Sequence, residues 1–241
     1  MKIRKVGIRM LEISNVSLSY DENKILDNIS YKFEEGKVYG LIGKNGAGKS
    51  SFLKTVSRLN RESKGDIKLN GVSIMDKDYL EVAISFIGDT PVYYPDLTLK
   101  EHLLLICSIK KISKSNALKQ INILLDLLRL DKYSSSFPNS LSRGTLQRLN
   151  IAIGIIRNEK LILMDEPFIT LDPVQVTVVE NLILQLKKEN KTIVISSHDI
   201  DSLESICDRY LILKNGKFLE YSPDEIDKKN ISKIINDSYG D

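Results

Sequence analysis

Hydrophobic residues recur along the chain at changing spacings, and each spacing predicts a different element. Residues 11–33 alternate between apolar and polar positions around a turn signal at 21–23, which is typical of an antiparallel β meander. Residues 38–42 form a short continuous apolar run, which predicts a buried strand. Residues 51–59 carry apolar side chains at helical spacing, so we expect a helix shortly after that strand.

Strand patterns return further along the chain. Residues 65–69 and 72–74 flank an Asn70-Gly71 turn, which predicts a hairpin, and Asn215-Gly216 predicts another near the end. Beyond residue 160, strands and helices alternate, which indicates a parallel α/β sheet. The predicted strands of this part are residues 161–164, 192–196 and 210–213, and a further strand is predicted earlier, at residues 82–87.

Helical patterns are of two kinds. Residues 99–109 and 117–130 are strongly helical without β-type alternation, so we expect a helical subdomain, about 97–158, inserted into the core. The remaining helical stretches follow strands, at residues 173–188, 200–207 and 223–237. We expect one domain over residues 10–222, with a disordered extension at 1–9 and a short helical tail at 223–241.

A phosphate-loop motif, G-x-x-x-x-G-K-[ST], lies between the predicted strand at 38–42 and the following helix. The motif consists of Gly43, Lys44, Asn45, Gly46, Ala47, Gly48, Lys49 and Ser50, followed by Ser51. Its glycines let the backbone wrap round phosphate oxygens, and the helix N-terminus supplies positive potential. Lys49 then reaches the β and γ phosphates and Ser50 a Mg²⁺ ion, so the motif predicts a nucleoside triphosphate site.

A second motif is the apolar strand at 161–164, which ends in Asp165 and Glu166. This pattern is typical of a Walker B strand. Asp165 is then expected to hold Mg²⁺, and Glu166 to act as general base on the water that faces the γ-phosphate.

Composition narrows the class of protein. The 241 residues carry a net charge of +3 from 35 basic and 32 acidic residues. Four positive charges lie in the first nine residues, which leaves −1 for the rest and gives no sign of a nucleic-acid partner. Cys107 and Cys207 form no C-x-x-C pair, which fits a reducing cytoplasm. No apolar run reaches 18 residues, so we expect no membrane span.

The chain resembles the nucleotide-binding subunit of ABC transporters from residue 11 to about 220. The matching motifs, in order, are Tyr20 as the adenine-stacking aromatic, 43–51 as Walker A, 141–145 as the signature segment, 161–166 as Walker B, 171–172 as the D-loop and His198 as the switch histidine. The resemblance implies a P-loop NTPase of class α/β, with a RecA-like core, an antiparallel β subdomain and the inserted helical subdomain. It also implies ATP and Mg²⁺ as cofactors.

In that family two copies dimerise head to tail, so that each ATP lies between one Walker A loop and the partner's signature segment. Ser142 and Gly144 precede a predicted helix at 146–156, whose positive end can meet a γ-phosphate. The resemblance adds Asp172 to this site, and His198 as a sensor of the γ-phosphate. His102, on the insertion, is expected to be structural.

Two positions depart from the family pattern. Asp89 stands where the family has a glutamine that contacts Mg²⁺ and the attacking water, and we expect Asp89 to be a metal contact. Arg143 and Thr145 replace the usual glycine and glutamine of the signature segment. A basic residue between the signature serine and glycine is similar to the pattern of some ABC exporter subfamilies, so the resemblance favours export.

Two functions remain open at this point. The first is an ATPase subunit that powers an exporter through separate transmembrane permease subunits, docked at residues 90–96 and held at the inner face of the cell membrane. The second is a soluble ABC-type ATPase that drives a cytoplasmic assembly, such as iron–sulfur cluster scaffolding. Chromosome-structure ATPases need long coiled-coil insertions, for which the hundred or so residues between the Walker motifs leave no room.

Overall fold

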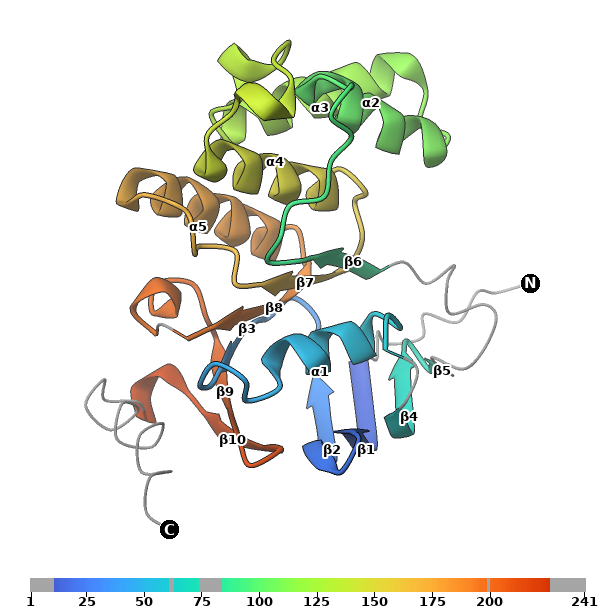
Figure 1. Cartoon of the computed structure of the whole chain (residues 1–241), viewed down its shortest axis with the longest axis vertical. Coiled ribbons are helices and arrows are strands. Elements are labelled where there is room, and N and C mark those ends of the chain that lie inside the picture. Colours follow the sequence, from blue (N-terminus) through green and yellow to red (C-terminus); the bar gives the residue numbers. More distant parts are fainter. Residues whose placement is uncertain (1–10, 61–62, 74–83, 199, 226–241) are drawn as a thin grey trace.

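Two β-sheets and the helices that cover them make up the computed structural model, which describes residues 11–60, 63–73, 84–198 and 200–225 (Figure 1). The smaller sheet has the order β2-β1-β4-β5 and is antiparallel throughout. Its strands are β1 (Leu11–Tyr20), β2 (Asn23–Phe33), β4 (Ser63–Leu69) and β5 (Val72–Ser73). The meander and the hairpin at Asn70-Gly71 are therefore confirmed, with both turn residues in the left-handed region that a type I′ turn requires.

The larger sheet has the order β10-β9-β3-β8-β7-β6. Its strands are β3 (Val38–Ile42), β6 (Ile84–Ile87), β7 (Leu161–Asp165), β8 (Thr192–Ser197), β9 (Arg209–Lys214) and β10 (Lys217–Tyr221). All neighbours are parallel except β9 and β10, which form the hairpin predicted at Asn215-Gly216. Because parallel strands end at the same edge, the segments after β3, β7 and β8 meet there, as ligand-binding segments of α/β sheets do.

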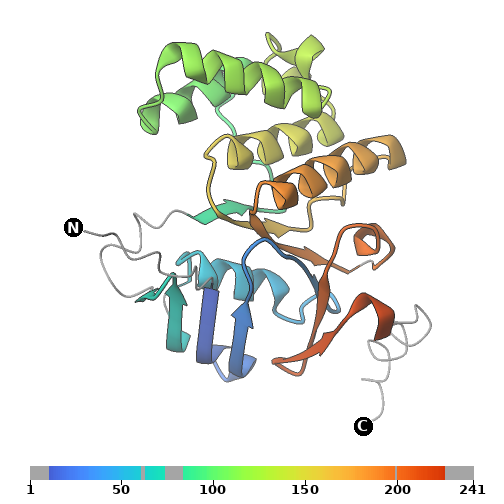
Figure 2. The same ribbon diagram turned by 180° about the vertical axis from the view of Figure 1, so that it is seen from behind.

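Helices cover both faces of the larger sheet. Helix α1 (Lys49–Val56) lies between it and the smaller sheet, whereas α4 (Arg143–Ile155) and α5 (Pro173–Lys188) lie on the opposite face (Figures 1 and 2). Helices α2 (Leu99–Ile109) and α3 (Lys114–Leu127) stack above α4. The α/β fold with its inserted helices is confirmed. In the residues that the structure covers, no helix has the length and apolar character to cross a membrane.

Alternate residues of the central strands pack into two separate hydrophobic cores, one on each face of the larger sheet. Tyr39 and Leu41 of β3 pack with α1 and the smaller sheet, whereas Val38 and Ile42 pack with the helices of the other face. Strands that are buried on both faces read as continuous apolar runs, which explains why 38–42 shows no alternation.

Several predicted helix limits were wrong. Helix α1 ends at Val56 rather than 59, because Arg58 is left-handed, and Leu59 is 62% exposed. Helix α3 runs three residues earlier than expected, since left-handed Arg129 ends it. Helix α4 begins at Arg143 rather than 146, because Ser142 caps it.

The predicted helix at 200–207 is only a short 3₁₀ turn, Asp201–Leu203. The packing of Leu203 and Cys207 against Gly40 of β3 holds this segment in place, where a Cβ on the glycine would lie 3.0 and 3.1 Å from their side chains. The predicted tail forms a 3₁₀ turn at Pro223–Glu225, and the rest of it lies outside the described residues, as does the extension at 1–9.

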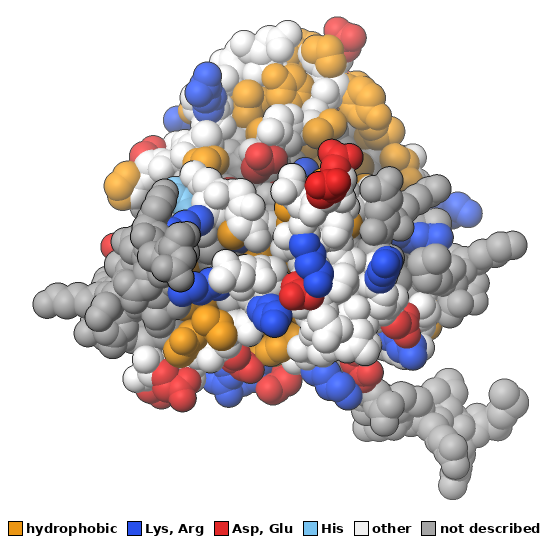
Figure 3. All heavy atoms as spheres, turned by 60° about the horizontal axis from the view of Figure 1, so that its bottom comes forward, with side chains coloured by type: hydrophobic (Ala, Val, Ile, Leu, Met, Phe, Trp, Pro, Cys, Tyr) orange, Lys and Arg blue, Asp and Glu red, His pale blue; other side chains and the backbone are white. Residues whose placement is uncertain are grey.

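The face formed by the lower end of the molecule carries mixed charge. Figure 3 shows lysine and arginine side chains interspersed with aspartate and glutamate among the coloured residues. A face of mixed charge lacks the concentrated positive potential that attracts the phosphate backbone of a nucleic acid.

Candidate functional site

The phosphate loop leaves β3 and turns directly into α1. Gly46 and Gly48 have φ of 82° and 102°, a conformation that other residues rarely adopt. A Cβ at Gly48 would also lie 2.7 Å from the Ile25 side chain. The loop therefore needs glycine at both positions for its turn, and at Gly48 also for its close approach to β2.

Lys49 is folded back into the loop that precedes it. Its side chain is only 6% exposed, and its Nζ donates to the carbonyl oxygens of Gly43 at 2.8 Å and Lys44 at 3.2 Å. The same nitrogen lies 3.5 Å from Oε1 of Glu166. A buried cation thus faces the carboxylate that follows β7.

Asp165 ends β7 and is fully buried. Its Oδ1 accepts a hydrogen bond of 2.6 Å from the Ser196 hydroxyl. Its Oδ2 is buried and has no hydrogen-bond partner in the described part of the chain. A buried carboxylate oxygen without a partner is costly, so this atom is the natural point for a bound cation or water.

Glu166 lies just beyond the strand in a left-handed conformation, with φ of 47°. Its N–H donates to the Ser196 hydroxyl at 2.9 Å and to the Ser196 carbonyl at 3.2 Å. Its Oε2 lies 2.9 Å from Nδ1 of His198, which follows β8 and is half exposed. The Glu166 carboxylate therefore lies between Lys49 and His198.

Lys49, Glu166 and His198 open onto one cavity of about 450 Å³. Its wall contains most of the predicted site residues, namely Asn45, Gly46, Gly48, Lys49, Ser50, Ser51, Asp89, Glu166 and His198. Asp165 does not line the cavity, because it is fully buried. The ends of β6, β7 and β8, the phosphate loop and the first turn of α1 thus converge on this cavity.

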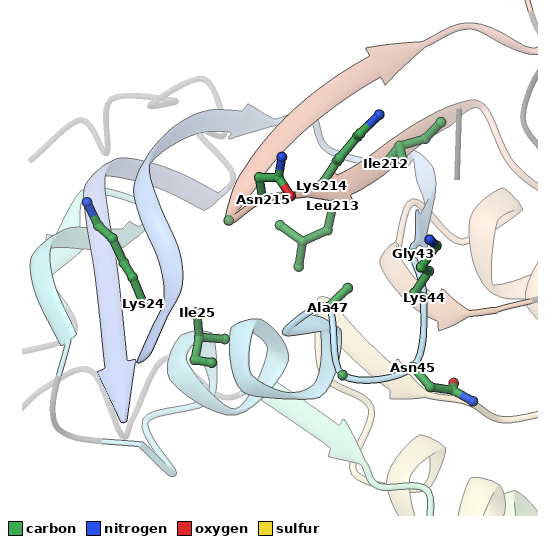
Figure 4. Close-up of a pocket in the computed structure, with 12 residues that line it drawn as sticks. Lys24, Ile25, Gly43, Lys44, Asn45, Ala47, Ile212, Leu213, Lys214 and Asn215 are labelled. Carbon is green, nitrogen blue, oxygen red and sulfur yellow. The ribbon is translucent and has the colours of Figure 1, made fainter. Parts of the chain in front are cut away.

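A second cavity of about 310 Å³ adjoins the same loop and includes the predicted residues Gly43 and Ala47. Figure 4 shows Ile25, Ala47 and Leu213 pointing toward one another across it. Tyr20 lines neither cavity. Tyr20 as a whole is 42% exposed, and its hydroxyl accepts a hydrogen bond from the Asn60 amide, which also donates to the Ser51 carbonyl.

The predicted signature residues lie elsewhere, on the α4 side of the larger sheet (Figure 1). The hydroxyl of Ser142 caps α4 by accepting from the Thr145 N–H. Gly144 lies inside the first turn of α4, whereas we expected it before the helix. Asp172 caps α5 through the N–H of Gln175, and none of the three predicted residues lines either cavity of the phosphate loop.

Gly144 is closely covered by the segment that leads into α5. A Cβ on Gly144 would lie 2.3 Å from Oε1 of Gln175 and 3.1 Å from the Thr170 carbonyl. The signature turn and the Asp172 turn therefore pack directly against each other within one chain.

Two functional contacts escaped the sequence interpretation. Ser196 forms hydrogen bonds with both Asp165 and Glu166. The sequence feature that could have identified it is a hydroxyl residue at the end of an apolar strand. Asn150 of α4 donates to the Gly88 carbonyl at 2.9 Å, next to Asp89, for which the sequence has no signal. His102 is structural as expected: it is buried, one ring nitrogen accepts from the Tyr94 N–H, and the other donates to the Thr98 carbonyl.

Known proteins share both the sequence and the fold. A family model described as "ABC transporter" matches residues 26–169. The ATP-binding protein EcsA of Bacillus subtilis is 33% identical over 86% of this chain and 85% of its own length. The bacitracin transport ATP-binding protein BcrA of Bacillus licheniformis is 31% identical over 92% of this chain and 72% of its own length.

Solved structures agree. The ATP-binding subunit of an ABC transporter superposes with a TM-score of 0.82 at 29% identity, over 94% of each chain. A dimeric ATP-binding cassette in a post-hydrolysis state, bound to ADP and Pi, has a TM-score of 0.79 at 25% identity, over 89% of this chain and 99% of that one. The chain therefore belongs to the ABC transporter family and is one of its ATP-binding, ATP-hydrolysing subunits.

Proposed function

We propose that two copies of this subunit, or one copy and a related subunit, close head to tail on ATP and so drive a membrane exporter. Each ATP then lies between the phosphate loop of one subunit and Ser142, Gly144 and Asp172 of the other. The separation of these two groups within one chain supports this arrangement, because they flank opposite faces of the larger sheet. An exposed Ser142 at the N-terminus of α4 is suited to a partner's phosphate.

The observation that carries the hydrolytic role is the contact of Glu166 with Lys49 and His198 in one cavity. When ATP binds, the γ-phosphate replaces Glu166 as the anionic partner of Lys49. The Glu166 carboxylate is then free to accept a proton from water. The water oxygen bonds to the γ-phosphorus as the bond to the β–γ bridging oxygen breaks, which yields ADP and inorganic phosphate. His198 contacts the γ-phosphate and senses its loss.

The donor set fits Mg²⁺. The orphaned Oδ2 of Asp165 lies in the same strand-end region as the Ser50 hydroxyl and the Asp89 carboxylate, and such oxygens are hard ligands. Within the described residues there is no cluster of three or more acidic, histidine or cysteine groups that could hold a metal alone. That is expected for Mg²⁺, which binds few protein carboxylates and completes its shell with phosphate and water. Bound Mg²⁺ neutralises phosphate charge.

Tyr20 is proposed to stack on the adenine. Its partly exposed ring and its anchoring through Asn60 beside α1 support this role, because an aromatic face must be accessible to stack.

A separate apolar groove of about 470 Å³ is proposed to receive the permease. It contains Val92 and Tyr94, which are 80% and 62% exposed, over a floor that includes Phe86, Ile106 and Ile153. Asp89 lines both this groove and the nucleotide cavity. It is therefore suited to couple permease movement to the metal site, and the permease would hold the subunit at the inner face of the membrane.

Export is supported by Arg143, a basic residue between the signature serine and glycine. Relatives named for transport of bacitracin and of a lantibiotic are 31% and 33% identical to this chain, and an osmoprotectant importer is 27% identical.

The test of the hydrolytic role is Glu166→Gln, with Glu189→Gln on the exposed end of α5 as its matched control. We expect Glu166→Gln to abolish turnover and to accumulate as an ATP-bound dimer in gel filtration, while the control behaves as the wild type. Lys49→Ala should lose ATP binding or turnover. A Glu166→Gln protein that stays monomeric with ATP and turns over normally would contradict the proposal.

A further inference from the structure

Ser196 is the residue on which both Walker B carboxylates depend. It lies directly opposite Asp165 in the parallel pairing of β7 with β8, and it is fully buried. Its hydroxyl donates to Asp165 Oδ1 at 2.6 Å and accepts from the Glu166 N–H at 2.9 Å. A hydroxyl has one proton and two lone pairs, so it serves both partners at once.

The contact with Glu166 stabilises an unusual backbone. At φ of 47° Glu166 is in the left-handed region, which a residue with a Cβ occupies only when its surroundings hold it there. Both acceptors of its N–H, the hydroxyl and the carbonyl, belong to Ser196. The direction of the Glu166 carboxylate, toward Lys49 and His198, therefore depends on Ser196.

The hydrogen bond from Ser196 to Asp165 determines which carboxylate oxygen of Asp165 stays available for a metal ion. The short hydrogen bond occupies Oδ1, and Oδ2 is left buried without a protein partner in the described chain. Without the hydroxyl the carboxylate would be free to rotate about its last bond and exchange the two oxygens.

We propose that Ser196 is a positioning residue of ATP hydrolysis: its hydroxyl holds Glu166 in its catalytic backbone conformation and orients Asp165 so that Oδ2 faces the metal. The inference rests on the proposed roles of Asp165 and Glu166.

Paired variants of Ser196 distinguish the effect of losing the hydroxyl from the effect of changing the size of a buried side chain. Ser196→Thr and Ser196→Val have nearly equal volume and differ in the hydroxyl, while Ser196→Ala removes it without adding bulk. Ser85→Ala is the matched control, because Ser85 is also fully buried and its hydroxyl makes one hydrogen bond of 2.8 Å, to the Gly154 carbonyl. Thermal unfolding of each full-length variant measures the cost of substitution in the folded chain.

We expect turnover to fall about 10- to 100-fold in Ser196→Ala and Ser196→Val, the range for losing a hydrogen bond to a charged group. Ser196→Thr should stay within about threefold of the wild type, and Ser85→Ala should be unchanged. In a spin-resonance titration with ADP, Mn²⁺ should bind Ser196→Ala about tenfold more weakly, with the affinity for metal-free ADP preserved.

Equal turnover and equal Mn²⁺ binding in Ser196→Ala and Ser85→Ala would overturn the inference. So would equal losses in Ser196→Thr and Ser196→Val, which would assign the effect to shape alone. If Glu166→Gln also left turnover intact, the proposed hydrolytic site itself would fail, which is a distinguishable result.

Discussion

At the scale of single residues, the chemistry depends on side chains that each serve two partners. Lys49 binds its own loop and faces Glu166, and Asp89 borders both the nucleotide cavity and the apolar groove. Such residues transmit a change at one partner to the other, so single substitutions at them have larger effects than their size suggests.

A substitution of Asp89 tests whether such a shared side chain matters at the proposed metal site. Asp89→Asn keeps the shape of the side chain and removes its charge, so we expect about tenfold lower turnover and a higher Mg²⁺ concentration for half-maximal rate. Asp96→Asn, an exposed acid on the same connector, is the control and should match the wild type. The measurement is the ATPase rate against Mg²⁺ concentration, and an unchanged curve for Asp89→Asn would argue against metal contact.

At the scale of elements, helix termini organise the site. Thr98 and Glu101 form a reciprocal capping box at the start of α2, whereas Ser113 begins α3 without a side-chain hydrogen bond. The α2 cap also lies beside the Tyr94 segment, since His102 of the same first turns binds the Tyr94 N–H. The stability of this helix start therefore affects the shape of the apolar groove.

Thr98→Ala should lower the free energy of unfolding by about 1 kcal/mol, as is usual for a lost N-cap, and Ser113→Ala should change it much less. The Thr98 hydrogen bonds lower the pKa of Glu101 below its ordinary value of 4.5. The contribution of the Glu101 carboxylate to the cap is therefore complete above that value and is lost as the pH falls through the lower pKa of the folded state, whereas the bond from the Glu101 N–H to the Thr98 hydroxyl remains. Urea unfolding at neutral and acid pH measures both effects; equal values for the two variants would contradict the assignment.

The packing of α5 on α4 leads to a second prediction for these elements. Gly144→Ala places a methyl group 2.3 Å from the Gln175 Oε1 position, so we expect ATP-driven dimerisation to weaken about tenfold. Gln175→Ala removes the obstructing amide, and the double variant should recover part of the loss. Gel filtration in the Glu166→Gln background measures dimer formation. No recovery in the double variant would mean that the methyl group acts on the partner's phosphate instead of on α5.

At the scale of the whole molecule, the proposed function depends on a surface that would meet the permease. The predicted connector at 90–96 forms one wall of an apolar groove, with α2 and α4 behind it. The Asn150 bond to Gly88 ties this groove to the strand end that carries Asp89.

Val92→Asp should therefore reduce the amount of membrane protein that copurifies with the subunit at least tenfold, while ATP binding by the isolated subunit stays normal. Ile109→Asp, at a similarly exposed apolar position on α2, is the control. Undiminished copurification of Val92→Asp would contradict the docking role, and recovery of the wild type only with soluble scaffold proteins would contradict the transporter assignment.

The residues by themselves determined the α/β order of elements, the position of the phosphate loop between β3 and α1, and the two acids at the end of β7, because each depends on a local pattern: apolar runs, glycines in a turn, and acids at a strand end. The tertiary structure alone revealed the contacts of Ser196, Asn150 and Gln175, which join neighbouring strands, α4 to the end of β6, and α5 to α4. It also decided that 200–207 is not a helix, since packing of Leu203 and Cys207 on Gly40 outweighs local helical spacing. Contacts between residues distant in sequence leave no local pattern, so they become visible only when the strands are paired.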